Sequence, residues 1–275
     1  MFMRSMRRLL IVMSAAMIAA CQAAAPPPLP TPENDGISRA AASNLAIIEW
    51  VRSPENIIFR ADVEGGYAAD SIRGKRDVPN CTIYGDARVV WVNELDPFRR
   101  EVLYDRLAPA VIADYIAYLT INERIYTFAT PTAAVPVYDA VVETIRINVN
   151  GIDQRTDGFS GWDGDDDWFR RVLAACRSLS GTPILFEPTN GWMSAIEVPY
   201  VQENPALTWD VAVTGLDLGE SAALDTPLWV TDAAAVQIWR AQNDQPSRFV
   251  FQQGERYFQV ALQVPGISRN SPSAP

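Results

Sequence analysis

A run of 12 apolar residues, Leu9 to Ala20, lies near the start of the chain, between a cluster of arginines and Cys21. A positively charged stretch, then a short apolar run, then small residues is the pattern of a secretory signal peptide. The run is too short for a lone transmembrane anchor, because crossing ~30 Å of hydrocarbon takes about 20 residues. We therefore expect residues 1–20 to be a signal that is removed, and the rest of the chain to fold outside the cytoplasm.

The end of this run, Ile18-Ala19-Ala20-Cys21, resembles a bacterial lipobox: a branched apolar residue, two small residues and a cysteine. The resemblance implies that Cys21 is acylated on its sulfur and becomes the new N-terminus. One acyl chain holds a protein to a bilayer only marginally, whereas several hold it stably. Ordinary signal cleavage, with Cys21 incidental, is the alternative. We expect the protein to be held by more than one acyl chain on the outer face of a bacterial membrane, on its extracellular or periplasmic side.

The segment after Cys21 is rich in proline, and residues 21–37 contain five. Such a segment favours extended polyproline II structure, at about 3.1 Å per residue, and is typical of a tether. We expect residues 38–267 to form the folded domain and residues 268–275 to form a disordered tail. The prolines within residues 131–136 mark a place where the domain could divide.

The charge of the chain limits its partners. Loss of the three arginines in the signal leaves 20 basic and 33 acidic residues, a net charge of −13. So acidic a surface repels phosphate backbones, and we expect no nucleic acid partner. It also disfavours electrostatic docking on anionic lipid, so membrane attachment must come from acyl chains.

The chain contains no histidine. This excludes Ser-His-Asp and Cys-His catalysis as well as zinc sites built on histidine. The sequence also has no phosphate-binding loop and no dinucleotide fingerprint. We therefore predict no cofactor and no recognisable enzymatic activity.

Two cysteines, Cys81 and Cys176, remain besides Cys21. Cysteines in an oxidising compartment can pair, and this pair would close a long loop. The alternative is two buried free thiols, since Cys176 lies on the apolar face of a predicted helix, where a thiol serves as a small hydrophobe. The sequence leaves both alternatives open, because it does not give the distance that a disulfide requires.

Periodicity predicts three main helices. Apolar residues recur at helical spacing over 109–126, a second such stretch follows Asp167, and a third follows Thr231, which would cap it. In the second stretch the expected apolar face holds Trp168, Phe169, Val172, Leu173, Cys176 and Leu179. A short helix over 38–50 is a weaker prediction.

Strand signals outnumber helix signals. We expect a strand over 56–63 and hairpins around Gly85-Asp86, Asn150-Gly151 and Gly254-Glu255, since glycine-containing pairs suit tight turns. Short strands are also expected at 184–186, 195–201 and 208–213. Because short turns join most strands, the sheets should be mainly antiparallel, and the fold class should be α+β.

Three motifs resemble those of uncharacterised bacterial lipoproteins that are secreted and lipid-anchored. They are Gly65-Gly66 at a strand end, the stretch from Pro79 to Val89 that contains Tyr84-Gly85-Asp86-Ala87-Arg88-Val89, and Gly254 to Val260. Ala87 stands where that family usually has glycine, which leaves the turn type open. The resemblance implies a secreted lipoprotein and carries no known activity.

An acidic loop holds the one candidate metal site, made of Asp157, Asp163, Asp165, Asp166 and Asp167. Calcium takes six to eight oxygen ligands, and closely spaced aspartates could supply them, although the spacing departs from the EF-hand pattern. We favour capping of the following helix, because it needs only one of these carboxylates and explains their position.

Three functions follow from these features. The first is a lipid-anchored module that binds an envelope protein or glycan. The second is a calcium-dependent binding module that uses the acidic loop. The third is a glycan hydrolase, which needs two carboxylates across a sugar and aromatic rings to stack on it, for which Trp162, Trp168 and Trp192 are candidates.

Overall fold

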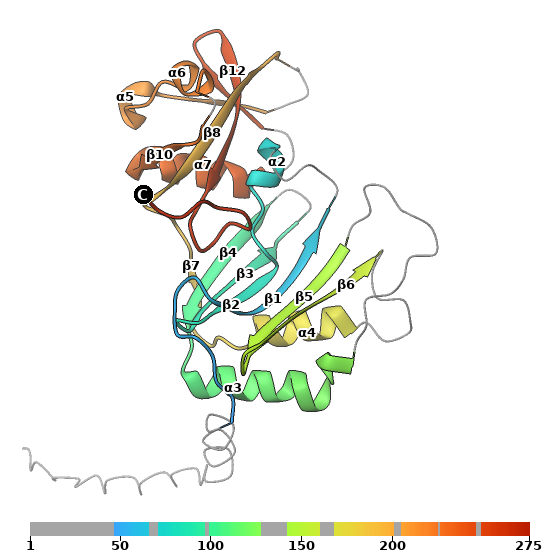
Figure 1. The fold of residues 1–275 in the computed structure, drawn as a ribbon. Coiled ribbons are helices and arrows are strands. Elements are labelled where there is room, and N and C mark those ends of the chain that lie inside the picture. Colours follow the sequence, from blue (N-terminus) through green and yellow to red (C-terminus); the bar gives the residue numbers. More distant parts are fainter. Residues whose placement is uncertain are drawn as a thin grey trace, which may run out of the picture. The chain divides into compact units, whose positions relative to one another are not determined.

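The computed structural model describes residues 47–65, 71–96, 99–127, 142–159, 168–200, 205–224, 226–245 and 249–275. The chain divides into two compact units, Met1–Asp35 and Gly36–Pro275, and all the described residues belong to the second. This unit contains two sheets with helices packed on them (Figure 1). The predicted α+β class is confirmed.

The first sheet has seven strands in the order β6-β5-β1-β2-β3-β4-β7, and every neighbouring pair is antiparallel. The hairpins predicted around Gly85-Asp86 and Asn150-Gly151 form four of its strands, β2 with β3 and β5 with β6. Asn150 and Gly151 both have positive φ, 52° and 72°, as the turn between β5 and β6 requires. The strands are β1 (Ile57–Glu64), β2 (Cys81–Tyr84), β3 (Arg88–Glu94), β4 (Arg100–Arg106), β5 (Val142–Val149), β6 (Ile152–Phe159) and β7 (Ile184–Leu185).

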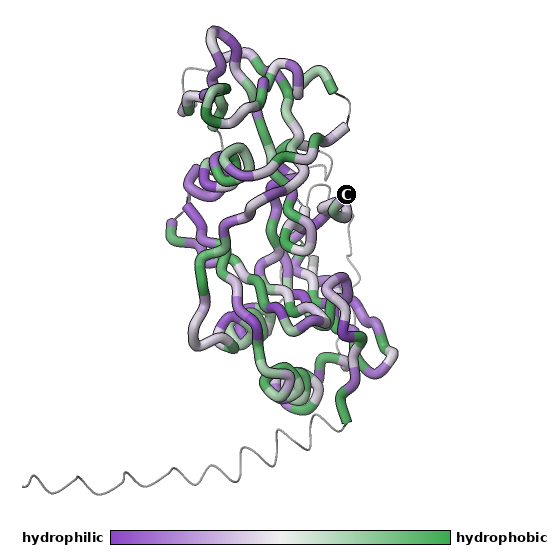
Figure 2. Tube along the Cα trace, turned by 90° about the vertical axis from the view of Figure 1, so that its left-hand side faces the viewer, coloured by the Kyte–Doolittle hydropathy of each residue, from purple (hydrophilic) through white to green (hydrophobic). Residues whose placement is uncertain are grey.

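Two helices, α3 (Pro109–Ala117) and α4 (Trp168–Arg177), cover one face of this sheet (Figure 1). Most residues of α3 are hydrophobic, and Figure 2 shows this helix nearly end-on. The predicted helix over 109–126 is confirmed up to a π-helical turn, η1 (Tyr118–Asn122), and then Arg124 adopts φ 49° and separates it from the 3-10 turn η2 (Ile125–Thr127). Helix α4 buries five of the predicted apolar residues, Trp168, Phe169, Val172, Leu173 and Cys176.

The second sheet has five strands in the order β10-β8-β12-β11-β9, with one parallel pair, β9 and β11. Helix α7 (Asp232–Asp244) packs on it and buries Ala235, Ile238 and Trp239, as its spacing predicts. The strands are β8 (Asn190–Val198), β9 (Ala206–Thr208), β10 (Leu228–Thr231), β11 (Val250–Gln253) and β12 (Arg256–Gln263), and the short helices are α2 (Ile72–Lys75), α5 (Val211–Thr214) and α6 (Leu218–Ala222).

The predictions for residues 208–213 and for the end of the segment 38–50 are wrong. The strand expected over 208–213 ends at Thr208, because the Asp210 side chain accepts a hydrogen bond from the Ala212 amide at 2.8 Å and starts α5. The helix expected over 38–50 is absent from its last residues, because the Glu49 amide donates to Asn150 Oδ1 at 2.7 Å and Glu49 O accepts from the Asn150 amide at 2.8 Å. Residues 38–46 lie outside the described part of the chain.

The two sheets share a hydrophobic core. Val90 and Val102 of the first sheet belong to the same buried cluster as Phe251 and Phe258 of the second sheet and Trp239 of α7. The chain passes from one sheet to the other at residues 186–189, between β7 and β8. The prolines at 131–136, which are outside the described residues, therefore do not separate the sheets, since β5 follows them and pairs with β1, and β6 pairs with β5.

Arg76 joins the two halves from within this core. The residue is 5% exposed, and its Nε and Nη2 donate to Val260 O at 3.1 and 2.9 Å. Its guanidinium lies over the Phe249 ring, 4.3 Å from the centroid. Burial lowers the pKa of Arg76 to about 10, so it remains charged at neutral pH.

The turn between β2 and β3 differs from its prediction in one respect. The positive φ, 70°, falls on Ala87 rather than on Gly85 or Asp86. Gly85 is needed for a different reason: a Cβ there would lie 2.1 Å from Val51 O. Ala87 thus occupies a backbone conformation that suits glycine.

Replacing Ala87 by glycine is expected to raise the free energy of unfolding by about 0.5 to 1 kcal/mol. The left-handed region costs a residue with a Cβ about 1–2 kcal/mol, of which glycine's greater freedom in the unfolded chain offsets part. Urea denaturation measures the change. As a control, Ala174→Gly on the exposed side of α4 should lower stability by about 1 kcal/mol. An Ala87→Gly variant less stable than the wild type would contradict the assigned turn.

Candidate functional site

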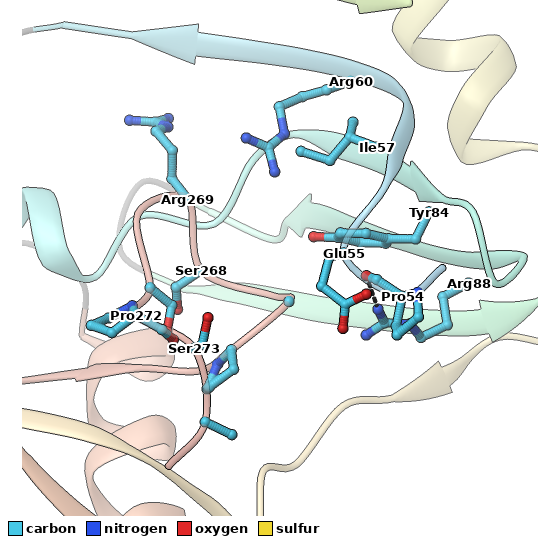
Figure 3. Close-up of a pocket in the computed structure, with 14 residues that line it drawn as sticks. Pro54, Glu55, Ile57, Arg60, Tyr84, Arg88, Ser268, Arg269, Pro272 and Ser273 are labelled. Carbon is cyan, nitrogen blue, oxygen red and sulfur yellow. Dashed lines mark hydrogen bonds between the residues drawn. The ribbon is translucent and has the colours of Figure 1, made fainter. Parts of the chain in front are cut away.

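A pocket of about 380 Å³ lies on the face of the first sheet opposite α3 and α4 (Figure 3). Strands β1, β2 and β3 supply one side, and the C-terminal segment, residues 265–274, supplies the other. Its size falls within the range of about 300–1,000 Å³ that is usual for small-molecule sites. Its principal side chains are Glu55, Arg60, Tyr84, Arg88 and Arg269.

Strand alternation places Arg60 in this pocket. Its neighbours Phe59 and Ala61 are fully buried on the helix-covered face, so Arg60 projects from the other face. Arg60 pairs in register with Thr82 of β2, and its Nε donates to Thr82 Oγ1 at 3.3 Å. In the part of the chain that the structure describes, Arg60 has no carboxylate partner.

Tyr84 lies beside Arg60 and is 3% exposed. Burial raises the pKa of its hydroxyl, although the charges of Arg60 and Arg88 oppose this rise. The hydroxyl is therefore protonated at neutral pH. Hydrogen bonding with Arg60 and Thr82 also opposes the rise in pKa. A protonated phenol can donate its hydrogen to a further acceptor.

Arg88 closes one end of the pocket. Its guanidinium lies over the Tyr84 ring, 4.5 Å from the centroid. Its Nε donates to both oxygens of Asp86 at 2.9 and 2.8 Å, and its Nη2 donates to Pro54 O at 2.6 Å. Glu55 on the same side accepts a hydrogen bond from the Ser53 hydroxyl, which lowers the pKa of Glu55 and keeps it ionised.

The C-terminal wall is held by Arg269. Its Nε and Nη2 donate to the two oxygens of Asp62 at 2.7 and 2.8 Å, and its Nη1 donates to Asp77 at 2.8 Å. Burial alone would lower the pKa of Arg269, but Asp62 and Asp77 raise it above its usual value. For Asp77 the signs are reversed: burial raises the pKa of its carboxyl, and the charge of Arg269 opposes that rise.

The prediction of a disordered tail over 268–275 is wrong, because hydrogen bonds and ion pairs hold this segment against the fold. Ser268 is 5% exposed, and its hydroxyl accepts from the Val264 amide at 2.9 Å. Further along, Ser273 O accepts from Trp192 Nε1 at 2.8 Å. The tail is fixed because Arg269 neutralises Asp62, a fully buried carboxylate.

A smaller cavity of about 240 Å³ adjoins the pocket and shares Arg60 and Arg269 with it. Two carboxylates line it, Glu64 and Asp77. Each forms an ion pair with an arginine: Glu64 with Arg155 at 3.1 Å, and Asp77 with Arg269 at 2.8 Å. These pairs occupy the carboxylates that a hydrolytic site here would use.

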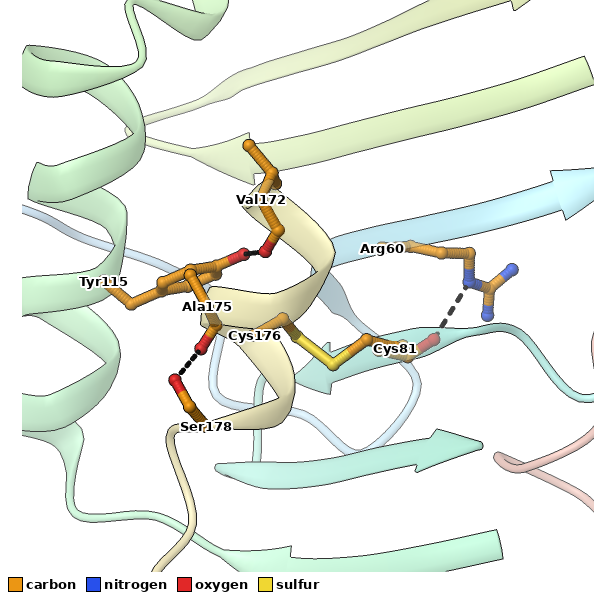
Figure 4. The surroundings of a disulfide bond; sticks show 8 residues. Arg60, Cys81, Tyr115, Val172, Ala175, Cys176 and Ser178 are labelled. Carbon is orange, nitrogen blue, oxygen red and sulfur yellow. Dashed lines mark hydrogen bonds between the residues drawn. A yellow bond between two sulfur atoms is a disulfide. The ribbon is translucent and has the colours of Figure 1, made fainter. Parts of the chain in front are cut away.

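Cys81 and Cys176 form a disulfide between β2 and α4 (Figure 4). The sulfur atoms are 2.00 Å apart, the Cα atoms are 6.4 Å apart, and both residues are fully buried. Of the two alternatives left open by the sequence, pairing is the one that the structure has. The bridge ties α4 to the strand that carries Thr82 and Tyr84.

Of the five aspartates in the acidic loop, the structure describes Asp157. Asp157 lies in β6 and accepts from Arg155 Nε at 2.7 Å. The other four residues, Asp163, Asp165, Asp166 and Asp167, are outside the described residues, so the calcium hypothesis stays a prediction. Within the described ranges no group of three or more acidic or cysteine side chains is placed to hold a metal ion.

The remaining candidates are distributed as follows. Trp168 is buried in the core and Trp192 packs edge to face on Trp229 with ring centroids 5.1 Å apart, while Trp162 is not described. The predicted lipobox, Ile18 to Cys21, is also outside the described residues. Among the helices that the structure describes, none is long and apolar enough to cross a membrane.

Comparisons with family models, with curated proteins and with solved structures found no match.

The sequence reasoning did not identify the pocket. One signal was present: in the stretch Phe59-Arg60-Ala61-Asp62, two charged residues alternate with apolar ones that are buried. Two opposite charges on one face of a predicted strand indicate that this face meets polar groups. The second wall, formed by residues 265–274, left no local signal.

Proposed function

We propose that this protein is an extracytoplasmic lipoprotein that is anchored through Cys21 and binds a component of the bacterial cell envelope, a protein or a glycan. The observation that carries the location is the disulfide between Cys81 and Cys176. Disulfides form and persist in oxidising compartments and are rare in the bacterial cytosol. The bridge thus supports the export that the signal-like residues 1–20 predict.

A binding role is supported by the pocket itself. Its arginines are held in place by hydrogen bonds and stacking, and they surround an open volume of about 380 Å³. Side chains fixed in this way bind a ligand with little loss of conformational freedom. The resemblance to secreted lipoproteins agrees with this role but names no ligand.

Replacing Cys21 by alanine is expected to release the protein from membranes, because acylation of the sulfur would be lost. Fractionation of the host cells, with a high-pH wash of the membranes, measures the distribution. Met17→Leu is the matched control, since it changes the apolar run but leaves residues 18–21 intact, and it should remain in the membrane fraction. Retention of the Cys21→Ala variant would indicate an uncleaved hydrophobic anchor instead.

A further inference from the structure

We propose that the pocket binds an anionic group, a carboxylate or a phosphate, through the guanidinium of Arg60 and the hydroxyl of Tyr84. The inference rests on the proposed binding function and names the chemical class of the ligand. It starts from two hydrogen-bond donors that line the pocket, Arg60 and Tyr84. The charge of Arg60 is not balanced by a carboxylate among the described residues.

A hydrogen bond orients the guanidinium of Arg60, which faces the cavity. Its Nε donates to Thr82 Oγ1, which orients the planar guanidinium, and the side chain points into the cavity (Figure 3). A guanidinium presents two parallel N–H groups that match the oxygens of a carboxylate or phosphate. Because no carboxylate among the described residues pairs with Arg60, an incoming anion would be its counterion.

Tyr84 supplies a second donor next to the first. Tyr84 lines the pocket, and its protonated hydroxyl can donate a hydrogen bond to a ligand oxygen. Arg88 holds the ring from its other side at 4.5 Å. The two donors therefore come from adjacent paired strands, which keep their separation fixed without a ligand.

The other arginines around the pocket form ion pairs with carboxylates of the chain. Arg88 and Arg106 share Asp86, and Arg269 is bound to Asp62 and Asp77. Glu55 is the ionised carboxylate on the rim, and it restricts the space for a second negative charge to the side away from it. The ligand that fits is thus a single small anionic group, alone or at the end of a longer molecule.

The net negative charge of the mature chain does not prevent an anion from binding in the pocket. Electrostatic interactions through water are screened over about 8 Å at physiological salt. The field within the pocket is therefore set by the groups that line it, and Arg60 is the nearest uncompensated charge.

Calorimetric titration of the full-length protein in detergent tests the proposal. The probes are inorganic phosphate and N-acetylglycine, each at constant ionic strength. We expect saturable binding of at least one probe and a weakening by about 10- to 100-fold in Arg60→Gln, as loss of a hydrogen bond to a charged group predicts. Arg124→Gln, which removes an equal charge from an exposed position after η1, should bind as the wild type does.

A second variant guards against misfolding of Arg60→Gln. Tyr84→Phe keeps the ring beneath Arg88 and removes only the hydroxyl, and it should bind more weakly by about 5- to 10-fold. Binding of phosphate alone would assign a phosphate-bearing ligand, and binding of N-acetylglycine alone would assign a carboxylate-bearing one. Saturable binding of neither probe, or unchanged binding by Arg60→Gln, would overturn the proposal. Neither result alters the membrane attachment that Cys21→Ala tests.

Discussion

Replacement of both Cys81 and Cys176 by alanine is expected to lower the free energy of unfolding by about 4 to 5 kcal/mol. The bridge joins residues 95 apart in sequence, and a cross-link of that span removes much of the entropy of the unfolded chain. For a domain of this size the melting temperature should fall by about 10–15 °C. Thermal unfolding followed by circular dichroism measures this directly.

The same bridge can be tested without mutation. A reductant should destabilise the wild type by nearly as much as the double replacement does, and should leave the double variant unchanged. Labelling of the denatured, unreduced protein with a thiol reagent is the control, since it should modify neither Cys81 nor Cys176. Two labelled thiols would show that the bridge does not exist in the protein.

Replacing Arg269 by alanine is expected to cost about 3–5 kcal/mol of stability. Asp62 is fully buried, and the bidentate ion pair with Arg269 is what compensates its charge. Removing one partner of a buried pair leaves the other charge buried and unpaired. The same change frees the C-terminal segment, which forms one wall of the pocket.

Arg256→Ala is the matched control. Arg256 also forms a close pair, with Glu197 at 2.6 Å, but the two side chains are each 50% exposed. Exposed pairs contribute at most about 1 kcal/mol, so this variant should differ little from the wild type in urea denaturation. Adding Asp62→Asn to Arg269→Ala should recover part of the loss. Equal effects of the two arginine replacements would contradict the assigned burial of Asp62.

The sequence predicts well what depends on neighbouring residues. The apolar spacing of α4 identifies its buried face, from Trp168 to Cys176, and Asn150-Gly151 identifies a turn that needs two positive φ angles. In both cases the decisive interactions lie within a few residues of each other. Such patterns remain visible in a single chain.

What the sequence could not predict depends on distant partners. Asp62 meets Arg269 across 207 positions, so neither the order of the C-terminal segment nor the second wall of the pocket has a local sign. The strand expected over 208–213 fails for the opposite reason, because a local cap by Asp210 overrides the strand propensity. The pocket therefore had to be seen in the fold.

Intact-mass spectrometry of the protein extracted from the membranes of its host tests the central claim most directly. The account predicts a chain that begins at Cys21, carries more than one acyl chain, and has the mass of a protein with one disulfide. A chain that retains residues 1–20, or that is cleaved elsewhere and carries no acyl group, would contradict a lipid-anchored lipoprotein.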